Sequence, residues 1–279
     1  MRRLAVLLPL AVLLLAIPIS VQGANPGWIG SCSYSHSSKD DPIVFPDQAR
    51  AGHLHDFVGA TTLKADSTAA TLRAGGTKCV IAGDRSSYWS PALYRRGVRI
   101  LPAATTKDAL IYYRRVGAPP GVTVQTIPEG LKMIVGNGHA HSAADSPGLG
   151  STITFKCGPG SGVELAVPPS QCASGVMVVS YRFPNCWDGK NLDSPDHISH
   201  MAYPVGDKCP STHPLAIPRV ETFFRYAVGT APIGKITWDS GPYYTAHQDF
   251  FNGWMAADLQ NLVDRCINAG MDCGTNPTP

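Results

Sequence analysis

The segments VMVVSYR (Val176–Arg182) and VETFFRY (Val220–Tyr226) decide the fold class of this chain. Both are rich in β-branched and aromatic residues, which favour strands over helices. Shorter segments of similar character recur between glycine and proline residues, a spacing typical of an all-β sandwich or barrel. These further segments are Val122–Ile127, Leu131–Val135, Ser151–Phe155, Val163–Val167 and Lys235–Trp238.

One stretch near the C-terminus has the periodicity of a helix instead. Asn252 can cap its start, Ala269 lies near its end, and Gly270 can terminate it. No linker or internal repeat divides residues 24–279. We therefore predict a single mainly-β domain over 24–279, a β-sandwich or jelly-roll-like fold with a C-terminal α-helix. The apolar face of that helix would carry Met255, Leu259, Leu262, Val263, Cys266 and Ile267.

The first residues have the three-part pattern of a secretory signal peptide. Met1-Arg2-Arg3 is basic, an apolar run extends to Ile17, and small residues near Gly23 suit a signal peptidase. The apolar run is short for a membrane span, and no second such run follows it. We predict a signal peptide over residues 1–23, a secreted, extracellular protein, and no membrane anchor after cleavage.

All eight cysteines lie beyond this leader, and an even number in an exported chain indicates disulfide bonds. None forms a CxxC pair, so the motif of a thiolate zinc site or a thioredoxin-like centre is missing. Eight cysteines allow many pairings, and the sequence alone does not choose among them. Proximity along the chain suggests Cys32–Cys79, Cys157–Cys172, Cys186–Cys209 and Cys266–Cys273.

Charge and motif content exclude several functions. Charged residues make up 15% of the 279 residues, and loss of Arg2 and Arg3 with the leader leaves a single excess positive charge. That balance is too even for non-specific nucleic-acid binding, so we expect no nucleic-acid partner. The chain also lacks GxSxG, HExxH, EF-hand and GxGxxG motifs, which excludes the usual hydrolase, protease, calcium-site and dinucleotide signatures.

The histidines are the main candidates for a functional site. His53 and His55 are two residues apart and share one face of an extended segment. Imidazoles presented in this way suit zinc, copper, iron or nickel. His139 and His141 have the same spacing, but they lie in a Gly/Ala-rich stretch that we leave out of the candidate site. The alternative is a structural role, in which each histidine and its neighbouring aspartate form hydrogen bonds to the backbone of loops.

Two further clusters combine histidines with carboxylates. His247 and Asp249 are two residues apart, and Asp56 directly follows His55. The last cluster comprises Asp193, Asp196, His197 and His200, in which the carboxylates could serve as acid and base in glycoside hydrolysis. Four aromatic residues could stack on sugar rings, although aromatics in a β-rich core are usually packing. They are Trp89, Trp187, Tyr203 and Trp254.

Blocks of the sequence resemble one family throughout, the secreted fungal and actinobacterial domain of unknown function 1996 (DUF1996). The most specific block is FPNCWDGKNLDSPDHISHMAYP at residues 183–204. The resemblance implies one extracellular domain of microbial origin. It also hints at glycans, because some fungal relatives carry carbohydrate-binding modules. The other blocks are DPIVFP (41–46), HLHDFVG (53–59), DRSSYWSPALY (84–94), CPSTHPLAIPR (209–219) and the stretch 247–254.

Two hypotheses follow for the function. The first is a hydrolase acting on extracellular polysaccharide, with one shared site that gathers the histidines and carboxylates of all these clusters. Its residues would be His53, His55, Asp56, Asp193, Asp196, His197, His200, His247 and Asp249. In a metal-free version Asp193 or Asp196 is the general acid/base. In a metal version, a divalent ion whose identity the sequence does not give is bound by His53, by His55 and by one of His197, His200 or His247. The alternative is a non-catalytic module that binds a cell-wall glycan through its tryptophans.

Overall fold

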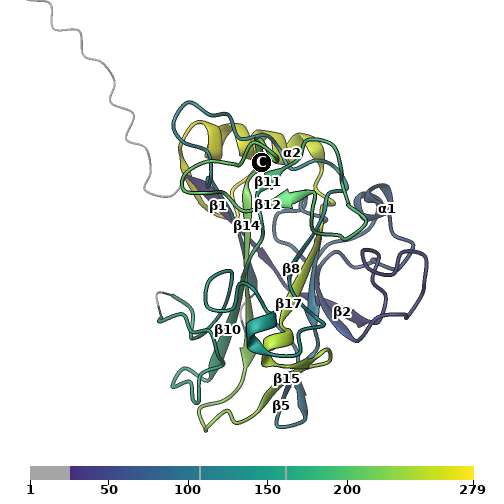
Figure 1. Cartoon of the computed structure of the whole chain (residues 1–279), viewed down its shortest axis with the longest axis vertical. Coiled ribbons are helices and arrows are strands. Elements are labelled where there is room, and N and C mark those ends of the chain that lie inside the picture. Colours follow the sequence, from purple (N-terminus) through teal and green to yellow (C-terminus); the bar gives the residue numbers. More distant parts are fainter. Residues whose placement is uncertain (1–25, 107, 161) are drawn as a thin grey trace, which may run out of the picture.

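The computed structural model describes residues 26–106, 108–160 and 162–279, so the expected signal peptide lies outside the described residues. Two β-sheets packed face to face form the body of the molecule (Figure 1). One has six strands in the order β18-β1-β7-β14-β10-β9, and the other has five in the order β2-β3-β4-β17-β8. Neighbouring strands are antiparallel, except that β18 runs parallel to β1. The prediction of a mainly-β fold is confirmed.

The bounds of the elements follow from the backbone hydrogen bonds. The six-stranded sheet contains β1 (Gly27–Cys32), β7 (Ala109–Arg114), β9 (Ile153–Cys157), β10 (Val176–Arg182), β14 (Arg219–Ala227) and β18 (Asp272–Thr275). The five-stranded sheet contains β2 (Tyr34–Ser38), β3 (His55–Gly59), β4 (Ser87–Pro91), β8 (Lys132–Gly136) and β17 (His247–Phe251).

Two small sheets and a few short helices complete the fold. One small sheet contains β5 (Leu93–Arg95), β6 (Val98–Ile100), β15 (Ile236–Trp238) and β16 (Gly241–Pro242). The other contains β11 (Cys186–Trp187), β12 (Met201–Ala202) and β13 (Leu215–Ala216). The helices are α1 (Ala69–Ala74), α2 (Ala256–Leu262), the 3-10 turns η1 (Ala143–Asp145) and η2 (Tyr243–Thr245), and the π-helical η3 (Val263–Asn268).

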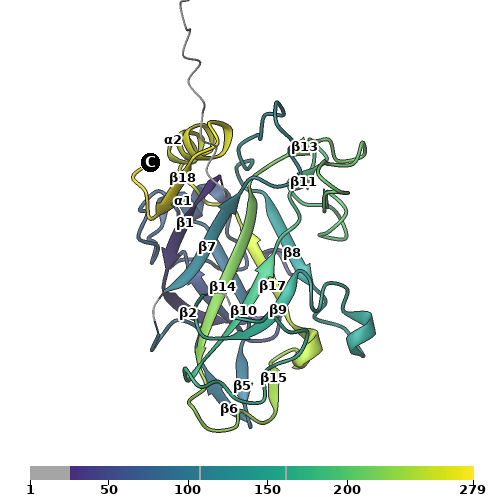
Figure 2. The ribbon, with the colours of Figure 1, turned by 90° about the vertical axis from the view of Figure 1, so that its left-hand side faces the viewer.

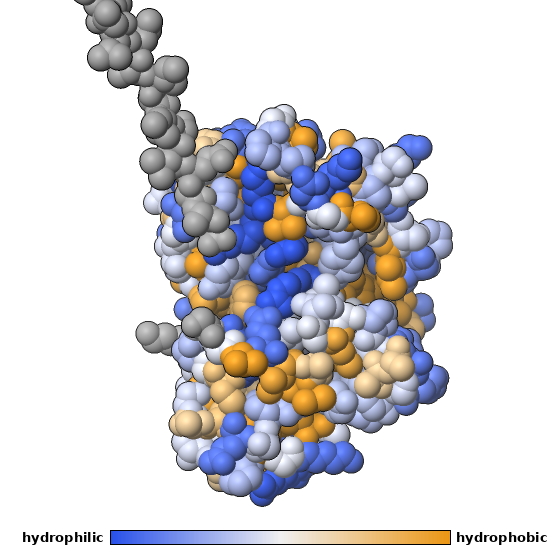
Figure 3. Space-filling model, turned by 60° about the vertical axis from the view of Figure 1, so that its left-hand side comes forward, coloured by the Kyte–Doolittle hydropathy of each residue, from blue (hydrophilic) through white to orange (hydrophobic). Residues whose placement is uncertain are grey.

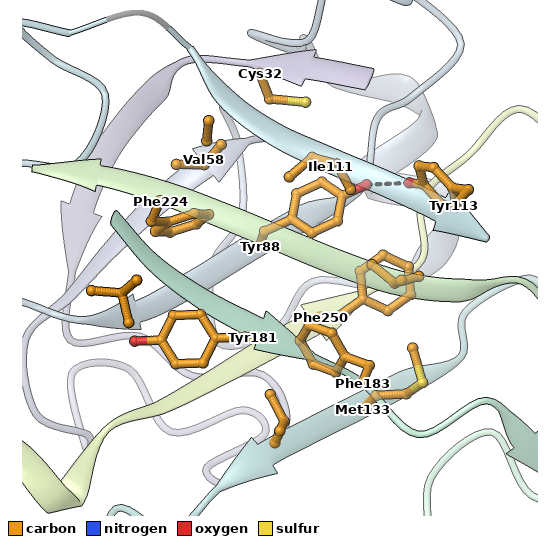
Figure 4. Close-up of a cluster of buried hydrophobic side chains, with 14 of the residues drawn as sticks. Cys32, Val58, Tyr88, Ile111, Tyr113, Met133, Tyr181, Phe183, Phe224 and Phe250 are labelled. Carbon is orange, nitrogen blue, oxygen red and sulfur yellow. Dashed lines mark hydrogen bonds between the residues drawn. The ribbon is translucent and has the colours of Figure 1, made fainter. Parts of the chain in front are cut away.

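The core lies between the two large sheets. Successive side chains of a strand point to opposite faces, so alternate residues of each sheet meet in the interior. Figure 4 shows Tyr181 and Phe224 of the six-stranded sheet in one cluster with Tyr88 and Phe250 of the five-stranded sheet. The hydroxyl groups of Tyr88 and Tyr113 form a hydrogen bond that joins the sheets. Burying each side chain the size of phenylalanine contributes about 1.5–3 kcal/mol, so this cluster is a major source of stability.

The strand predictions succeed where the segment faces the core. Val176–Arg182 is β10 with the predicted bounds, and Val220–Tyr226 lies within β14. The predictions for Val122–Ile127 and Val163–Val167 are wrong. The main-chain groups of Val124 bond to the side chain of Asn268 rather than to a strand. Residues 163–167 form a single bridge to β9, and the valines at both ends are exposed. The other three segments overlap β8, β9 and β15.

The C-terminal helix is confirmed, but it begins four residues later than predicted. Asn252 does not cap it, because its side-chain amide donates to the carbonyl oxygens of Ile127 and Pro128. Gly253 is packed against the backbone of Arg85, where the helix has not yet begun. The helical residues are therefore 256–268, and Met255 at their edge is 39% exposed rather than buried.

Four disulfide bonds join the cysteines as their proximity along the sequence suggested. They are Cys32–Cys79, Cys157–Cys172, Cys186–Cys209 and Cys266–Cys273. Each closes a loop and stabilises the fold mainly by restricting the unfolded chain. Within the described residues, no helix has the length and apolar character needed to cross a bilayer.

The outer faces of the two large sheets differ. A layer formed by residues 39–52 and 60–74, on either side of β3 in the sequence, covers the outer face of the five-stranded sheet, where Ile43, Leu63 and Leu72 pack on Phe57 and Trp89. Within the part of the chain that the structure describes, no comparable layer covers the outer face of the six-stranded sheet, which faces the viewer in Figure 2. The candidate site lies at the end of the covered face.

Candidate functional site

Three histidines from two distant parts of the sequence converge on the outer face of the five-stranded sheet. His55 begins β3 and His247 begins β17, and these two strands lie on either side of β4. His53 lies in the loop just before β3. Nε2 of His247 is 3.1 Å from Nε2 of His53 and 3.5 Å from Nε2 of His55. The spacing along the sequence therefore predicted that His53 and His55 lie together, and the strand order of the sheet brings His247 beside them.

The separations of these nitrogens fit a shared metal ion. In a tetrahedral site with Zn–N bonds of about 2.0–2.1 Å, two ligand nitrogens lie about 3.3 Å apart. The two separations from His247 bracket that value, and one ligand atom from each of the three histidines lies within 4.8 Å of the others. Hydrogen bonding can satisfy only one of these two contacts, because the single lone pair of Nε2 of His247 can accept from one in-line donor.

The tautomer of His247 is set by its own strand. Its Nδ1 lies 2.9 Å from the carbonyl oxygen of Thr245, which can only accept, so Nδ1 carries the proton. The lone pair of Nε2 is then free to point toward the other two histidines. A metal-binding histidine is commonly oriented by such a second hydrogen bond.

Burial keeps all three imidazoles neutral. It lowers the pKa of His53 to about 4 and the pKa of His247 to about 3. The pKa of the fully buried His55 is also well below its ordinary value, first through desolvation and then through its histidine neighbours. Neutral imidazole is the form that binds a metal ion, so the ligands need not release protons at neutral pH.

A buried carboxylate completes the cluster. Oδ2 of Asp249 is 4.0 Å from Nε2 of His55, and both carboxylate oxygens lack a hydrogen-bond partner among the described residues. Desolvation, followed by the charge of Asp41, raises the pKa of Asp249 well above its usual range. A buried acid without a partner is costly, and a cation beside it would remove that cost.

The backbone around His247 is shaped to hold its ring. A side chain at Gly138 would place a Cβ 2.8 Å from Cε1 of His247, so only glycine fits there without displacing the imidazole. The loop that carries His53 is anchored in turn, because the amide of Leu54 donates to Oδ2 of Asp239 at 2.7 Å. Both contacts position the histidines without touching the space between them.

A cavity of about 410 Å³ opens onto the cluster, lined by His53, His247 and Asp249 among others. Asp196 and His197 also line it, so two of the predicted residues from the 193–200 cluster share this space. Asp41 and His139 line it as well, and the sequence analysis did not include either of them. The repeated His-x-His spacing at 139–141 was the available signal for His139, and the available signal for Asp41 was its place at the start of the DPIVFP block.

Asp196 is unsuited to the predicted role of general acid. Its carboxylate accepts hydrogen bonds from Ser194 and from both the amide and the hydroxyl of Ser199. The Ser194 bond, followed by the Ser199 bonds, lowers the pKa of Asp196 well below its usual range. The carboxylate is therefore ionised and holds its loop together.

Asp193 and His200 do not line the cavity. Asp193 bonds to Nδ1 of His197 at 2.9 Å and lies 3.5 Å from Nζ of Lys132. His200 is buried, with Nδ1 at 2.9 Å from Oγ of Ser194 and Nε2 donating to the carbonyl oxygen of Lys132 at 2.7 Å. Both residues therefore hold the loop 193–200 in place, which is the structural role considered for them as the alternative to catalysis.

Asp56 also lies away from the cluster. Strand alternation directs its side chain to the opposite face of β3 from His55. There it accepts hydrogen bonds from Ser37 and Arg99. Desolvation raises its pKa, and the bonds from Ser37 and Arg99 oppose that effect. We assign Asp56 to the structure rather than to the site.

The predicted sugar-stacking residues divide into two groups. Trp89 and Trp254 are buried, Trp89 against Phe57 and Trp254 against Trp28, so neither offers a face to a ligand. The prediction that Trp89 and Trp254 stack on sugars is therefore wrong. The identity of an aromatic residue does not indicate whether its side chain faces the core or the solvent. Trp187 is partly exposed and Tyr203 is 40% exposed, but neither lines the cavity at the histidines.

These features define a β-sandwich protein with a buried three-histidine cluster beneath an open cavity. The chain belongs to the family described as Domain of unknown function (DUF1996), whose model matches residues 41–254. That range includes every residue of the cluster and of the cavity. Comparison with curated proteins found no match, and neither did comparison with solved structures.

Proposed function

We propose that this protein is a secreted, metal-dependent hydrolase that acts on extracellular polysaccharide at the His53–His55–His247 cluster. The observation that carries the proposal is the convergence of three neutral imidazoles and an unpartnered buried carboxylate at one cavity. The predicted leader and the four disulfide bonds support an extracellular setting.

The donor set suits a divalent ion such as Zn²⁺. His53, His55 and His247 would bind it, and three protein ligands leave a coordination position open for water. Such an ion lowers the pKa of bound water to near neutrality and polarises a carbonyl oxygen. Asp249 would balance the charge of the cation or accept the proton of the attacking water.

Among polysaccharide bonds, these residues suit acyl esters better than glycosidic linkages. Glycoside cleavage generally needs an acid that donates a proton to the leaving oxygen. Asp196 is held ionised, and Asp193 lies outside the cavity beside His197 and Lys132. Asp249 lines the cavity and has a raised pKa, but a cation beside it would favour its ionised form and so would remove it as a proton donor. An ester needs only an activated water and a polarised carbonyl, which the histidine cluster with its ion would supply.

The cavity wall supplies groups that could position the substrate. Asp196, His197 and His139 lie at the wall around the cluster, where hydroxyl groups of a sugar could bond to them. His55 lies beneath and is fully buried. In this arrangement the metal ligands differ in access, with His53 the nearest to solvent.

The test is hydrolysis of acetylated xylan by the purified chain from residue 24 onward. Two products are measured, free acetate and new reducing ends, with Zn²⁺ present and after removal with a chelator. We expect acetate release that disappears on chelation and returns with Zn²⁺. His247→Ala should lower the rate by roughly a thousandfold, because a ligand is lost.

His141→Ala is the matched control, because His141 is exposed and does not line the cavity. It should retain the full rate. Hydrolysis that survives chelation, or that is equally lost in His141→Ala, would contradict the proposal. Release of reducing ends with the same dependence on Zn²⁺ and His247 would support the histidine cluster as the active site, but it would show that the glycosidic linkage rather than the ester is cleaved.

A further inference from the structure

The uncovered outer face of the six-stranded sheet carries a second concentration of functional groups. A band of hydrophilic residues runs over this side of the molecule (Figure 3). The strands β7, β10, β14 and β9 form the surface in this region (Figure 2). A hollow of about 300 Å³ lies on it. This face is separated from the histidine cluster by the sandwich core.

Two aromatic rings form the centre of the hollow. The rings of Tyr112 and Phe223 are 4.8 Å apart and meet edge to face. The guanidinium of Arg114 lies 4.7 Å from the centre of the Tyr112 ring, and Nζ of Lys156 lies 5.0 Å from the centre of the Phe223 ring. Half-buried aromatics among charged groups offer an apolar surface with polar edges.

The charges on this face are unbalanced. Glu164 is paired with Arg182, and Glu221 is paired with Arg219. Three more cations, Arg114, Lys156 and Arg225, line the hollow. Nζ of Lys156 lies 3.9 Å from Glu164, so this acid is shared by two cations. Counted over these residues, five cations lie with two glutamates, a formal excess of three positive charges.

Two of these cations are held in place by burial. Lys156 is only 7% exposed and Arg225 only 8%, yet both line the hollow. Within the described part of the chain, Arg225 has no carboxylate oxygen within 4.0 Å. The side chain of Arg225 is thus packed into the sheet while its charge faces the hollow without an acid beside it, which suits the binding of an anion.

We propose that this face binds an acidic polysaccharide whose sugars carry carboxylates. Guanidinium groups bond bidentately to carboxylates, and the two glutamates can accept bonds from sugar hydroxyls. Tyr112 and Phe223 can contact the apolar faces of the sugars. Arg219 and Arg225 lie six residues apart on β14, about 20 Å, so the surface accommodates several sugar units.

A polysaccharide fits this face better than a nucleic acid does. Glu164 and Glu221 lie among the cations, where they can accept hydrogen bonds from sugar hydroxyl groups, whereas the phosphodiester backbone of DNA would offer them acceptors alone. That the ligand is a polysaccharide rests on the proposed function. The binding itself does not require hydrolysis, so the two proposals can fail separately.

The experiment measures binding of polygalacturonate by the purified chain from residue 24 onward, with neutral dextran and single-stranded DNA as comparisons. We expect binding of polygalacturonate, no binding of dextran, and weaker binding of DNA. Lys156→Gln/Arg225→Gln should weaken polygalacturonate binding by at least about tenfold. Arg114→Gln, at a half-buried cation, should weaken it by a smaller factor and is the second variant if the double variant unfolds.

Lys190→Gln/Lys208→Gln is the matched control, because it removes two exposed charges away from the hollow. It should bind polygalacturonate as the wild type does. His53→Ala/His247→Ala should also retain binding while losing hydrolysis, which separates this proposal from the proposed function. Absence of polygalacturonate binding, equal binding by the Lys156/Arg225 variant, or DNA binding as tight as polygalacturonate binding would each overturn it.

Discussion

The outer faces of the two large sheets show how one sandwich can present two kinds of chemistry. On the five-stranded sheet, a layer formed by residues 39–52 and 60–74 packs over the strands, and burial holds His53, His55 and His247 neutral. On the six-stranded sheet no such layer is found among the described residues, and Arg182 and Arg219 form ion pairs with glutamates. The comparison indicates that a covering layer favours neutral imidazoles suited to bind a metal ion, whereas an open sheet face favours charged side chains suited to bind an ionic ligand.

The two faces should also differ in how tightly they bind a ligand and in how long a ligand they can contact. A desolvated cluster can hold one ion tightly at a fixed point, because its ligands are already neutral and oriented. A charged open surface is screened by salt, but it extends over the length of a strand. We expect changes on one face to leave the other almost unaffected.

The largest expected effect comes from His55→Leu. This variant should bind Zn²⁺ at least about a hundredfold more weakly, since a ligand is lost. The metal-free protein should be as stable as the wild type or more so, because His55 is a buried polar group whose Nδ1 has no partner in the described chain. Zinc titration and urea unfolding measure the two effects. A variant that unfolds even without metal would show that His55 is needed for folding.

Zinc should stabilise the wild-type protein. A ligand present at a hundred times its Kd raises the free energy of unfolding by about 2.7 kcal/mol. For a domain of this size the melting temperature should rise by roughly 5–10 °C, and a chelator should reverse the change. Lys156→Gln/Arg225→Gln should show the same rise. An unchanged melting temperature in the wild type would argue against a preformed metal site.

Gly138→Ala should have an intermediate effect on the covered face. The new methyl group would displace the ring of His247, and zinc affinity should fall by roughly tenfold, as for other positioning contacts. Gly30→Ala is the matched control, because its nearest new contact would be an ordinary 3.8 Å. Equal zinc affinities for the two variants would show that the His247 ring is free to move.

The smallest expected effect is that of pH on zinc affinity. A histidine with a pKa of 6.5 is mostly protonated at pH 5.5 and would weaken zinc binding by about tenfold per ligand. Because the pKa values are about 4 for His53 and about 3 for His247, both remain neutral at that pH. The loss due to histidine protonation should therefore begin only as the pH drops through about 4, and between pH 7.5 and 5.5 the single proton of Asp249, whose pKa is raised by burial, is the remaining contribution of the cluster. A steep loss near pH 6.5 would mean that the cluster is solvated.

Local sequence patterns were enough for the strands that face the core and for part of the site. Alternation placed His53 beside His55 and His247 beside Asp249, because residues two apart share a strand face. The meeting of these pairs depends on the order β3-β4-β17, which no local pattern encodes. The same limitation explains the misplaced Trp89, whose strand face depends on register.

The covering layer was a further feature that the sequence did not reveal. Asp41 reaches the cavity because its loop folds over the five-stranded sheet, and its raised pKa follows from burial there. His139 reaches the cavity from the segment that follows β8. Its His-x-His spacing was visible, but it lay outside the blocks that resembled the family.

The central claim is that His53, His55 and His247 form a metal site, and X-ray absorption spectroscopy at the zinc edge of the zinc-loaded protein tests it most directly. We predict one ion per chain with three imidazole nitrogens at about 2.0–2.1 Å and the remaining ligands oxygen. The signal should be absent in His53→Ala/His247→Ala and unchanged in His141→Ala. Substoichiometric zinc, or a first shell without histidine nitrogens, would contradict the assignment of this cluster as a metal centre.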